Sequence, residues 1–233
     1  MHHLFSAEIV DIADIAQDTK KFSFRIVENA PKPFFPGQFF LLSLENNINR
    51  AYSIASSPSA LPFFDLLIKR VPNGAATDGF LWKASVGDHL SFRGPMGRFT
   101  LRHPEKKHIF IATGTGLAPM RSFWQFLLEQ GSPPPVHLVF GVRDEDHLFC
   151  EQELAELSQK YSSFSYTICL SRPHHPHNTY VSGRVTDYCA SLPPSAFADA
   201  DVFLCGSRGM VEDMKAILTE KGVQKEHIGI ESW

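Results

Sequence analysis

A short polar stretch inside an otherwise apolar region contains three side chains suited to ligand chemistry. Arg50, Tyr52 and Ser53 lie in "NRAYSIASSPSALP", residues 49–62, whose first residues have the pattern of a β-strand. Because side chains alternate along a strand, Arg50 and Tyr52 are expected on one face and Ser53 on the other. A solvated edge strand explains these residues, and so does a flat ligand that carries phosphates.

A second candidate is the glycine turn in "IFIATGTGLAPMRSF". Gly114 and Gly116 follow an apolar segment and precede a helical pattern, and Pro119 suits the first turn of that helix. Glycines let a pyrophosphate approach the backbone, and a helix start favours anions. A GxG alone is more simply a tight turn, and this is not the GxGxxG fingerprint. The stretches predicted to converge at the same end of the sheet are "CLSRP" (169–173), "LCGSRGM" (204–210) and "IESW" (230–233).

Composition restricts the class of protein. The 233 residues are 43% hydrophobic with a net charge of −3, which suits a folded protein and gives no reason to expect a nucleic-acid partner. The sequence has no apolar run of bilayer length and no signal peptide, so we expect a cytoplasmic protein without membrane contact. The four scattered cysteines lack CxxC spacing, which excludes the usual signature of a plant-type iron–sulfur site. A soluble protein without a signal peptide is expected to keep its thiols reduced.

The elements that must position these residues fall into two halves. Up to about Thr100 the chain shows short strands with turn residues between them, a pattern typical of a barrel or sandwich. One helix is predicted to begin near Thr77. The predicted strands of this half cover 21–27, 37–44, 63–70 and 89–95.

The second half alternates strand and helix patterns, which predicts a parallel sheet covered on both faces. A helix is predicted over 117–131, ending at Gly131. The predicted strands cover 109–113, 136–142, 165–171, 201–207 and 227–232. We place a domain boundary near residue 104.

Seven stretches occur in one order along the chain: RAYS (50–53), GAAT (74–77), GPMG (94–97), GTGLAP (114–119), SRP (171–173), CGSRGM (205–210) and a final ESW. Together they strongly resemble the ferredoxin–NADP reductase family over almost the whole chain. The resemblance implies an antiparallel FAD-binding β-barrel domain over 1–103 and a parallel-sheet NAD(P)-binding α/β domain over 104–233.

The resemblance also implies a flavin site. Arg50 would neutralise the flavin pyrophosphate, Tyr52 would pack on the isoalloxazine, and Ser53 would hydrogen-bond near N5. Thr77 is a plausible N-cap of a helix start that holds the phosphates, a reason to favour FAD over FMN. The implied FAD residues are Arg50, Ala51, Tyr52, Ser53, Ile68, Lys69, Val71, Gly74, Ala75, Ala76, Thr77 and Trp233.

A nicotinamide nucleotide site is implied in the same way. Ser171, Arg172 and Tyr180 resemble the group that binds the adenosine 2′-phosphate, which favours NADPH over NADH, although relatives that use NADH vary in this loop. The implied NADP residues are Thr113, Gly114, Thr115, Gly116, Pro119, Ser171, Arg172, Tyr180, Cys205, Gly206 and Met210. No metal site is predicted, because His174, His175 and His177 in the same loop have no second group of ligands.

The implied reacting residues are Ser53, Cys205, Glu231 and Trp233. Cys205 would lie beside the nicotinamide, although a thiol among aliphatic residues is usually core. Glu231 either organises charge around the flavin or is a solvated carboxylate. Trp233 would cover the flavin face that the nicotinamide must reach.

These residues predict a flavoenzyme that moves electrons between NADPH and a separate carrier protein, such as a ferredoxin or flavodoxin. We expect a monomer. Several cations are expected to be exposed near the flavin, and they have two explanations. They form a docking surface for an acidic carrier, or they are the ordinary charged surface of a barrel. These residues are Lys69, Arg70, Lys83, Arg93 and Arg98. The alternatives are an NAD(P)H-dependent reductase component of an oxygenase, a flavin reductase, and a non-catalytic nucleotide-sensing subunit.

Overall fold

The computed structural model describes residues 4–44, 48–176 and 179–232. The chain divides into two compact units, each described here by itself. Unit 1 comprises Met1–Thr100 and Arg121–Phe126, and unit 2 comprises Leu101–Met120 and Leu127–Trp233. Within the described ranges, none of the helices has both the length and the apolar character needed to cross a membrane.

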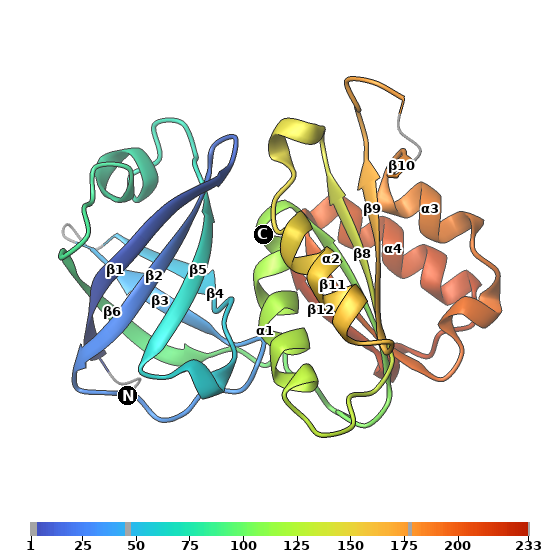
Figure 1. Cartoon of the computed structure of the whole chain (residues 1–233), viewed down its shortest axis with the longest axis horizontal. Helices are drawn as coiled ribbons and strands as arrows, with labels where there is room; N and C mark the ends of the chain where they lie inside the picture. Colours follow the sequence, from blue (N-terminus) through green and yellow to red (C-terminus); the bar gives the residue numbers. More distant parts are fainter. Residues whose placement is uncertain (1–3, 45–47, 177–178, 233) are drawn as a thin grey trace. The chain divides into compact units, whose positions relative to one another are not determined.

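Unit 1 is built on a six-stranded antiparallel sheet in the order β4-β3-β6-β1-β2-β5 (Figure 1). The sheet is barrel-like but not closed: among the described residues, its edge strands β4 and β5 are joined by an isolated bridge from Ile54, just after β4, to Leu66. The strands are β1 (Leu4–Ala16), β2 (Thr19–Glu28), β3 (Phe39–Ser43), β4 (Asn49–Ser53), β5 (Phe63–Lys69) and β6 (His89–Met96).

Phenylalanine rings fill the interior of unit 1 because alternate residues of each strand point inward. Phe24 stacks on Phe64 with ring centroids 5.0 Å apart, and it meets Phe92 edge-on at 5.1 Å. Phe5 and Phe40 are also fully buried in this cluster. The predicted strands are confirmed, but β1 was not predicted, since its apolar residues alternate with charged ones over only part of its length.

Unit 2 contains a six-stranded parallel sheet in the order β10-β9-β8-β7-β11-β12. Its strands are β7 (Lys107–Thr113), β8 (Val136–Val142), β9 (Phe164–Leu170), β10 (Val181–Ser182), β11 (Ala200–Gly206) and β12 (Ile228–Ser232). Its helices are α1 (Leu117–Leu128, whose middle belongs to unit 1), α2 (Glu151–Lys160), α3 (Val185–Ser191) and α4 (Arg208–Glu220). Figure 1 shows α3 and α4 on the face of the sheet opposite α2. The two predicted fold classes are therefore confirmed.

The apolar faces of α3 and α4 bury one side of the parallel sheet. Val185 and Cys189 from α3 and Met214 and Leu218 from α4 pack in one cluster with buried strand residues such as Leu204. The prediction that α1 reaches Gly131 is wrong: the helix ends at Leu128, where a turn from Leu127 to Gln130 leads into prolines 133–135 that cannot continue a helix.

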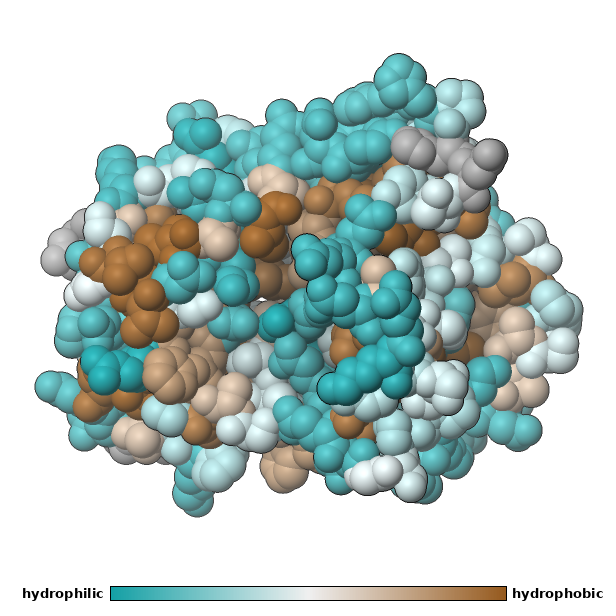
Figure 2. Space-filling view, in the orientation of Figure 1, coloured by the Kyte–Doolittle hydropathy of each residue, from teal (hydrophilic) through white to brown (hydrophobic). Residues whose placement is uncertain are grey.

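Polar residues cover most of the visible surface, and apolar residues emerge in separate groups (Figure 2). The large apolar residues that are exposed among the described ones are Leu4, Phe35, Phe63, Val71, Val86 and Ile230. Such isolated groups are ordinary for a soluble fold and do not by themselves mark a binding face.

The ring cluster should dominate the stability of unit 1. We expect Phe24→Ala to lower the free energy of unfolding by about 3–5 kcal/mol, because it leaves a cavity among rings that cannot collapse fully. Phe35→Ala is the control, since Phe35 is 69% exposed, and it should change stability by less than about 0.5 kcal/mol. Urea unfolding followed by circular dichroism measures both. Equal losses in the two variants would contradict a core centred on these rings.

Candidate functional site

The strand β4 keeps strict alternation at the polar stretch. Tyr52 lies opposite the buried Phe40 of β3, so its side chain is on the face of the sheet that packs against the core. Ser53 lies opposite Phe39 and is on the other face. Arg50 is on the side of Tyr52 but exposed, at the start of the strand. Burial raises the pKa of Tyr52 to about 12, so its phenol is neutral at physiological pH.

The flavin residues predicted after β5 lie in a tightly bonded loop. The Thr77 hydroxyl donates to the Val71 carbonyl at 2.9 Å and accepts from the Val71 amide at 3.2 Å, which closes the loop on itself. Asp78 accepts from Arg70 at 2.6 Å and from the Asn73 amide at 2.9 Å. The loop is therefore held in shape before any ligand binds.

The prediction that Thr77 caps a helix is wrong. Ala76 is the N-cap of a short π-helix, η3 (Thr77–Leu81), and the Thr77 hydroxyl is used by Val71 instead. Gly74 is needed in this loop, because a Cβ atom there would lie 2.6 Å from Thr77 Oγ1 and 2.8 Å from the Val71 carbonyl oxygen.

These two groups of residues meet at the open edge of the barrel. The antiparallel bridge from Ile54 to Leu66 directs Tyr52 and Ser53 toward the end of β5 that carries Ile68 and Lys69. Ile68 is buried, whereas Lys69, Val71 and Ala75 are exposed. Unit 1 thus brings the predicted flavin residues of β4, β5 and the following loop to one edge.

The segment that follows β4 is fixed by polar residues from 121–126 within unit 1. Arg121 donates to the Ala55 carbonyl at 2.9 Å and to the Asp65 carboxylate at 3.1 Å. The Ser122 hydroxyl donates to the Ser56 carbonyl at 2.7 Å. One of these bonds is buried and two are partly buried, so they constrain the backbone directly after Ser53 more strongly than exposed pairs would.

In unit 2, the parallel register places small residues in one row at the carboxyl ends of four strands. Thr113 on β7 pairs with Gly141 on β8, Gly206 on β11 lies at the same level, and Ser232 pairs with Gly206. A Cβ atom on Gly206 would lie 2.2 Å from Thr113 Oγ1 and 2.4 Å from Met210 Cε. Gly206 is therefore required first by packing around Thr113, whatever ligand binds above it.

The predicted glycine turn follows β7 directly. It forms a short 3₁₀ turn, η4 (Gly114–Gly116), which leads into α1, and buried Pro119 lies in the first turn of that helix as predicted. Gly114 has φ = +52°, and a Cβ atom there would have open space around it within 4 Å. The Leu117 N–H bonds to the Gly114 carbonyl within this turn, and the N–H groups at the start of such a turn and helix suit an anion.

Cys205 and Glu231 are neighbours on paired strands of the same sheet. Cys205 Sγ lies 3.8 Å from Glu231 Oε2, and the thiol is fully buried. Burial and the Glu231 carboxylate both raise the pKa of Cys205 well above its ordinary value, so the thiol remains protonated and is not a nucleophile. The structure therefore brings Cys205 and Glu231 together, with the sulfur as a small, uncharged side chain.

The predicted 2′-phosphate residues lie beyond β9. The amides of Ser171 and Arg172 bond to the carbonyls of Val142 (3.1 Å) and Arg143 (2.7 Å), which leaves both side chains exposed. The Tyr180 hydroxyl donates to Glu151 at the start of α2, and burial followed by this contact raises the Tyr180 pKa to about 12.

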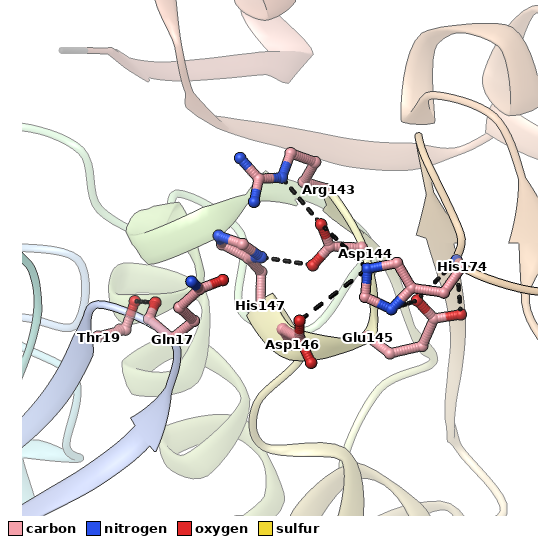
Figure 3. Close-up of polar contacts among 8 residues, drawn as sticks. All are labelled: Gln17, Thr19, Arg143, Asp144, Glu145, Asp146, His147 and His174. Carbon is pink, nitrogen blue, oxygen red and sulfur yellow. Dashed lines mark hydrogen bonds and ion pairs between the residues drawn. The ribbon is translucent and has the colours of Figure 1, made fainter.

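A polar cluster at the end of β8 was missed by sequence reasoning (Figure 3). The buried Asp144 carboxylate accepts from Arg143 Nε at 2.9 Å and from His147 Nδ1 at 2.5 Å. Burial alone would raise the pKa of Asp144, but the bonds from Arg143 and His147 outweigh it and lower the pKa to about 2. The run "VRDEDH" immediately after an apolar strand was the available signal.

The reason given for excluding a metal at the histidine loop is also wrong. Asp144, Asp146 and His174 offer ligand atoms within 4.8 Å of one another, so a second group of ligands does meet the loop (Figure 3). Exposed acidic groups of this kind are common without an ion. His177 and Trp233 lie outside the described residues, so the predictions for these two residues stay predictions.

Both units match oxidoreductase domain families, so the chain is an oxidoreductase. Residues 6–101 match the oxidoreductase FAD-binding domain, and residues 110–216 match the oxidoreductase NAD-binding domain. The chain therefore carries one domain for FAD and one for a nicotinamide nucleotide. The glycine-lined loops of both units fit such nucleotides, since they place bare backbone where phosphates must approach.

The chain belongs to the ferredoxin–NADP reductase family. It is 31% identical to "Ferredoxin--NADP reductase B" of Sorangium cellulosum, over 98% of this chain and 97% of that protein. It is 29% identical to the toluate 1,2-dioxygenase electron transfer component of Pseudomonas putida, over 94% of this chain, and spans only 65% of that relative. A solved cytochrome P450 reductase of Amycolatopsis, GcoB, has 30% identity and a TM-score of 0.89, with 100% of this chain and 71% of that chain covered.

Gly206 provides a test of the row at the carboxyl ends of the strands. We expect Gly206→Ala to destabilise the protein by about 1–3 kcal/mol, because the new methyl group overlaps the Thr113 hydroxyl. The double variant Gly206→Ala with Thr113→Ala should recover part of the loss. Gly209→Ala is the control, since nothing lies within 4 Å of its Cβ position on α4. Thermal unfolding measures all three, and no recovery in the double variant would contradict the proposed overlap.

The ion pairs of Asp144 can be tested through the pH dependence of the free energy of unfolding. Its pKa is lower in the folded chain than its ordinary value of 3.8, so it contributes stability above pH 4 that is lost as pH falls toward 2. We expect Asp144→Asn to cost on the order of 1 kcal/mol at pH 7 and almost nothing near pH 2. Exposed Asp213 on α4 gives the control, Asp213→Asn. A cost for Asp144→Asn that did not shrink in acid, measured by urea unfolding across pH, would refute the ion-pair explanation.

Proposed function

We propose that this chain is an FAD-dependent enzyme that transfers electrons between NADPH and a separate one-electron carrier protein, such as a ferredoxin or flavodoxin. The observation that carries the proposal is that one chain holds both nucleotide domains and matches a ferredoxin–NADP reductase over nearly its full length. Bound FAD would supply the redox chemistry that links a two-electron nicotinamide donor to a one-electron carrier. We propose the boundary between the domains near residue 104.

In this proposal the residues at the open edge of unit 1 bind the flavin. Arg50 is an exposed, permanently charged fork that suits the pyrophosphate. Tyr52 supplies a neutral ring held by the core, and the preformed loop over 70–78 offers backbone near Gly74. Ser53 lies on the other face of β4, so we propose that its hydroxyl reaches the edge of the flavin ring rather than its face.

The glycine turn of unit 2 binds the coenzyme pyrophosphate in this proposal. Thr113, Gly114 and Gly116 present backbone at the helix start, and the open space at Gly114 supports a close approach. The protonated Cys205 thiol positions the nicotinamide ring without reacting with it, which agrees with its burial and its Glu231 partner.

The preference for NADPH rests on exposed cations at one loop. Arg172 is exposed and its backbone is anchored to Arg143, which is itself a cation at the end of β8. A dianionic 2′-phosphate matches two guanidinium groups better than a ribose hydroxyl does. We therefore propose Arg172 as the main determinant and Arg143 as a second contributor.

A reductase component that supplies an oxygenase is the second candidate, because several relatives have that description. Among them is the propane 2-monooxygenase reductase component of Rhodococcus jostii, which is 30% identical. The chain spans 61% of that protein and 65% of the toluate dioxygenase component, against 97% of the Sorangium reductase. Exposed Lys69, Lys83, Arg93 and Arg98 are compatible with an acidic carrier.

An anaerobic titration followed by visible absorption tests the proposal. The purified protein should show a bound-flavin spectrum that bleaches at a lower concentration of NADPH than of NADH. In Arg172→Ala, half-bleaching should need about tenfold or more NADPH, because a charge-assisted contact is lost, while NADH titration should change less than about twofold. Lys215→Ala removes an exposed charge from α4 and should leave both titrations unchanged.

Each result bears on a separate part of the proposal. A colourless protein that takes up no added flavin would refute the flavoenzyme. If Arg172→Ala weakened the bleaching by NADPH and by NADH equally, the role of Arg172 in coenzyme preference would be refuted, but the flavoenzyme would not. Reoxidation of the reduced protein by ferredoxin or flavodoxin supports the free carrier, whereas reoxidation by neither removes that part of the proposal.

A further inference from the structure

A cluster of ionisable side chains lies at the amino ends of the parallel strands of unit 2, away from the glycine turn. Asp201 near the start of β11 is buried, with 3% of its side chain exposed. His227 Nδ1 lies 2.6 Å from one of its carboxylate oxygens, and His103 Nδ1 lies 2.9 Å from the other. Three separate parts of the chain thus bring two imidazoles and one carboxylate together.

The strand register produces this convergence. His108 on β7 pairs with Asp201, and Val202 pairs with Ile228, so His227 stands beside Asp201 just before β12 begins. His103 comes from the segment that precedes β7. Because the strands are seven residues long, this edge is roughly 20 Å from the glycine turn at the other ends of the strands. The cluster is therefore separate from the proposed nucleotide site.

We propose that His103, Asp201 and His227 form a binding site for a divalent first-row transition-metal ion, with Zn²⁺ as the best match. The ligand atoms are Nδ1 of each histidine and one Asp201 oxygen, and all lie within 4.8 Å of one another. Two imidazoles and a carboxylate are a donor set that Zn²⁺ uses when further positions hold water. The histidine side chains are 42% and 32% exposed, which leaves the ion a path from solvent.

The geometry needs only a small adjustment to hold the ion. Ligand atoms around a tetrahedral zinc are about 3.3 Å apart. The two imidazoles now contact different Asp201 oxygens, at 2.6 and 2.9 Å, so they must shift by on the order of 1 Å to share an ion with one oxygen. His103 and His227 lie in short segments outside the strands, where such movement is inexpensive, whereas Asp201 is fixed in β11. The ion replaces the imidazole protons that now bridge to the carboxylate.

Two cations near the cluster in the sequence are both hydrogen-bonded elsewhere. Neighbouring Arg102 and Lys107 donate to the carbonyls of Glu226 (2.5 Å) and Ala196 (2.7 Å), so both positive groups have partners outside the cluster. With neutral imidazoles the three ligands carry one net negative charge. Asp201 already contacts both imidazoles through its two oxygens, so its carboxylate faces the position that the ion would take.

His108 is a second, independent observation. It is fully buried next to Asp201, and within the described ranges neither of its ring nitrogens has a hydrogen-bond partner of normal geometry. A polar ring left unpaired in a core is costly, and water on a bound ion would supply the missing partner.

Calorimetric titration of the chelator-treated full chain with ZnCl₂ tests the site. We expect one ion per chain in the native protein. In His103→Gln and in His227→Gln the affinity should fall by about tenfold or more, because the glutamine amide still donates to Asp201 but is a poor zinc ligand. Zn²⁺ should also raise the melting temperature of the native protein more than that of either variant.

Two controls separate this site from other histidines. His89→Gln changes an exposed histidine of β6, and His174→Gln removes the ligand from the Asp144 cluster. Both should bind Zn²⁺ like the native protein. The proposal is overturned if the native chain binds no Zn²⁺, if His103→Gln and His227→Gln bind it normally, or if His174→Gln alone loses it. Circular dichroism verifies folding, and if either glutamine variant misfolds, the other decides the result.

Discussion

The hydrogen-bonded parallel register of β7, β11 and β12 is the constraint on which the chemistry of unit 2 depends. It fixes every residue of one strand opposite a given residue of the next, so rows of side chains run across the sheet. One row joins Cys205 to Glu231, and the row four residues earlier joins His108 to Asp201. A slip by one residue would move all of these groups to the opposite face.

The two ends of that sheet have different characters for a physical reason. At the carboxyl ends the chain turns into helix starts, whose free N–H groups and small residues favour an anionic nucleotide. At the amino ends the strands begin after exposed segments, where polar side chains can converge from the connecting chain. The buried Asp201 is stable there only because two imidazoles satisfy both of its oxygens.

Unit 1 differs from unit 2 in having an open sheet edge. Its antiparallel sheet curls around the phenylalanine rings but does not close. A full ladder between β4 and β5 would pair the backbone that now lies open at this edge. The single bridge at Ile54 keeps the edge open, while Arg121 and Ser122 hold the backbone beyond it. The same residues that finish the core of this unit therefore also shape its candidate site.

The sequence by itself determined the two fold classes and the family, because strand and helix periodicity are local and the ordered motifs from RAYS to CGSRGM are short-range signals. It also indicated Cys205, Gly114 and Gly206. Only the tertiary structure decided the use of the Thr77 hydroxyl, the Asp144 cluster and the meeting of His103, Asp201 and His227. These depend on contacts between residues up to about a hundred positions apart, which follow from strand register and loop closure rather than from local pattern.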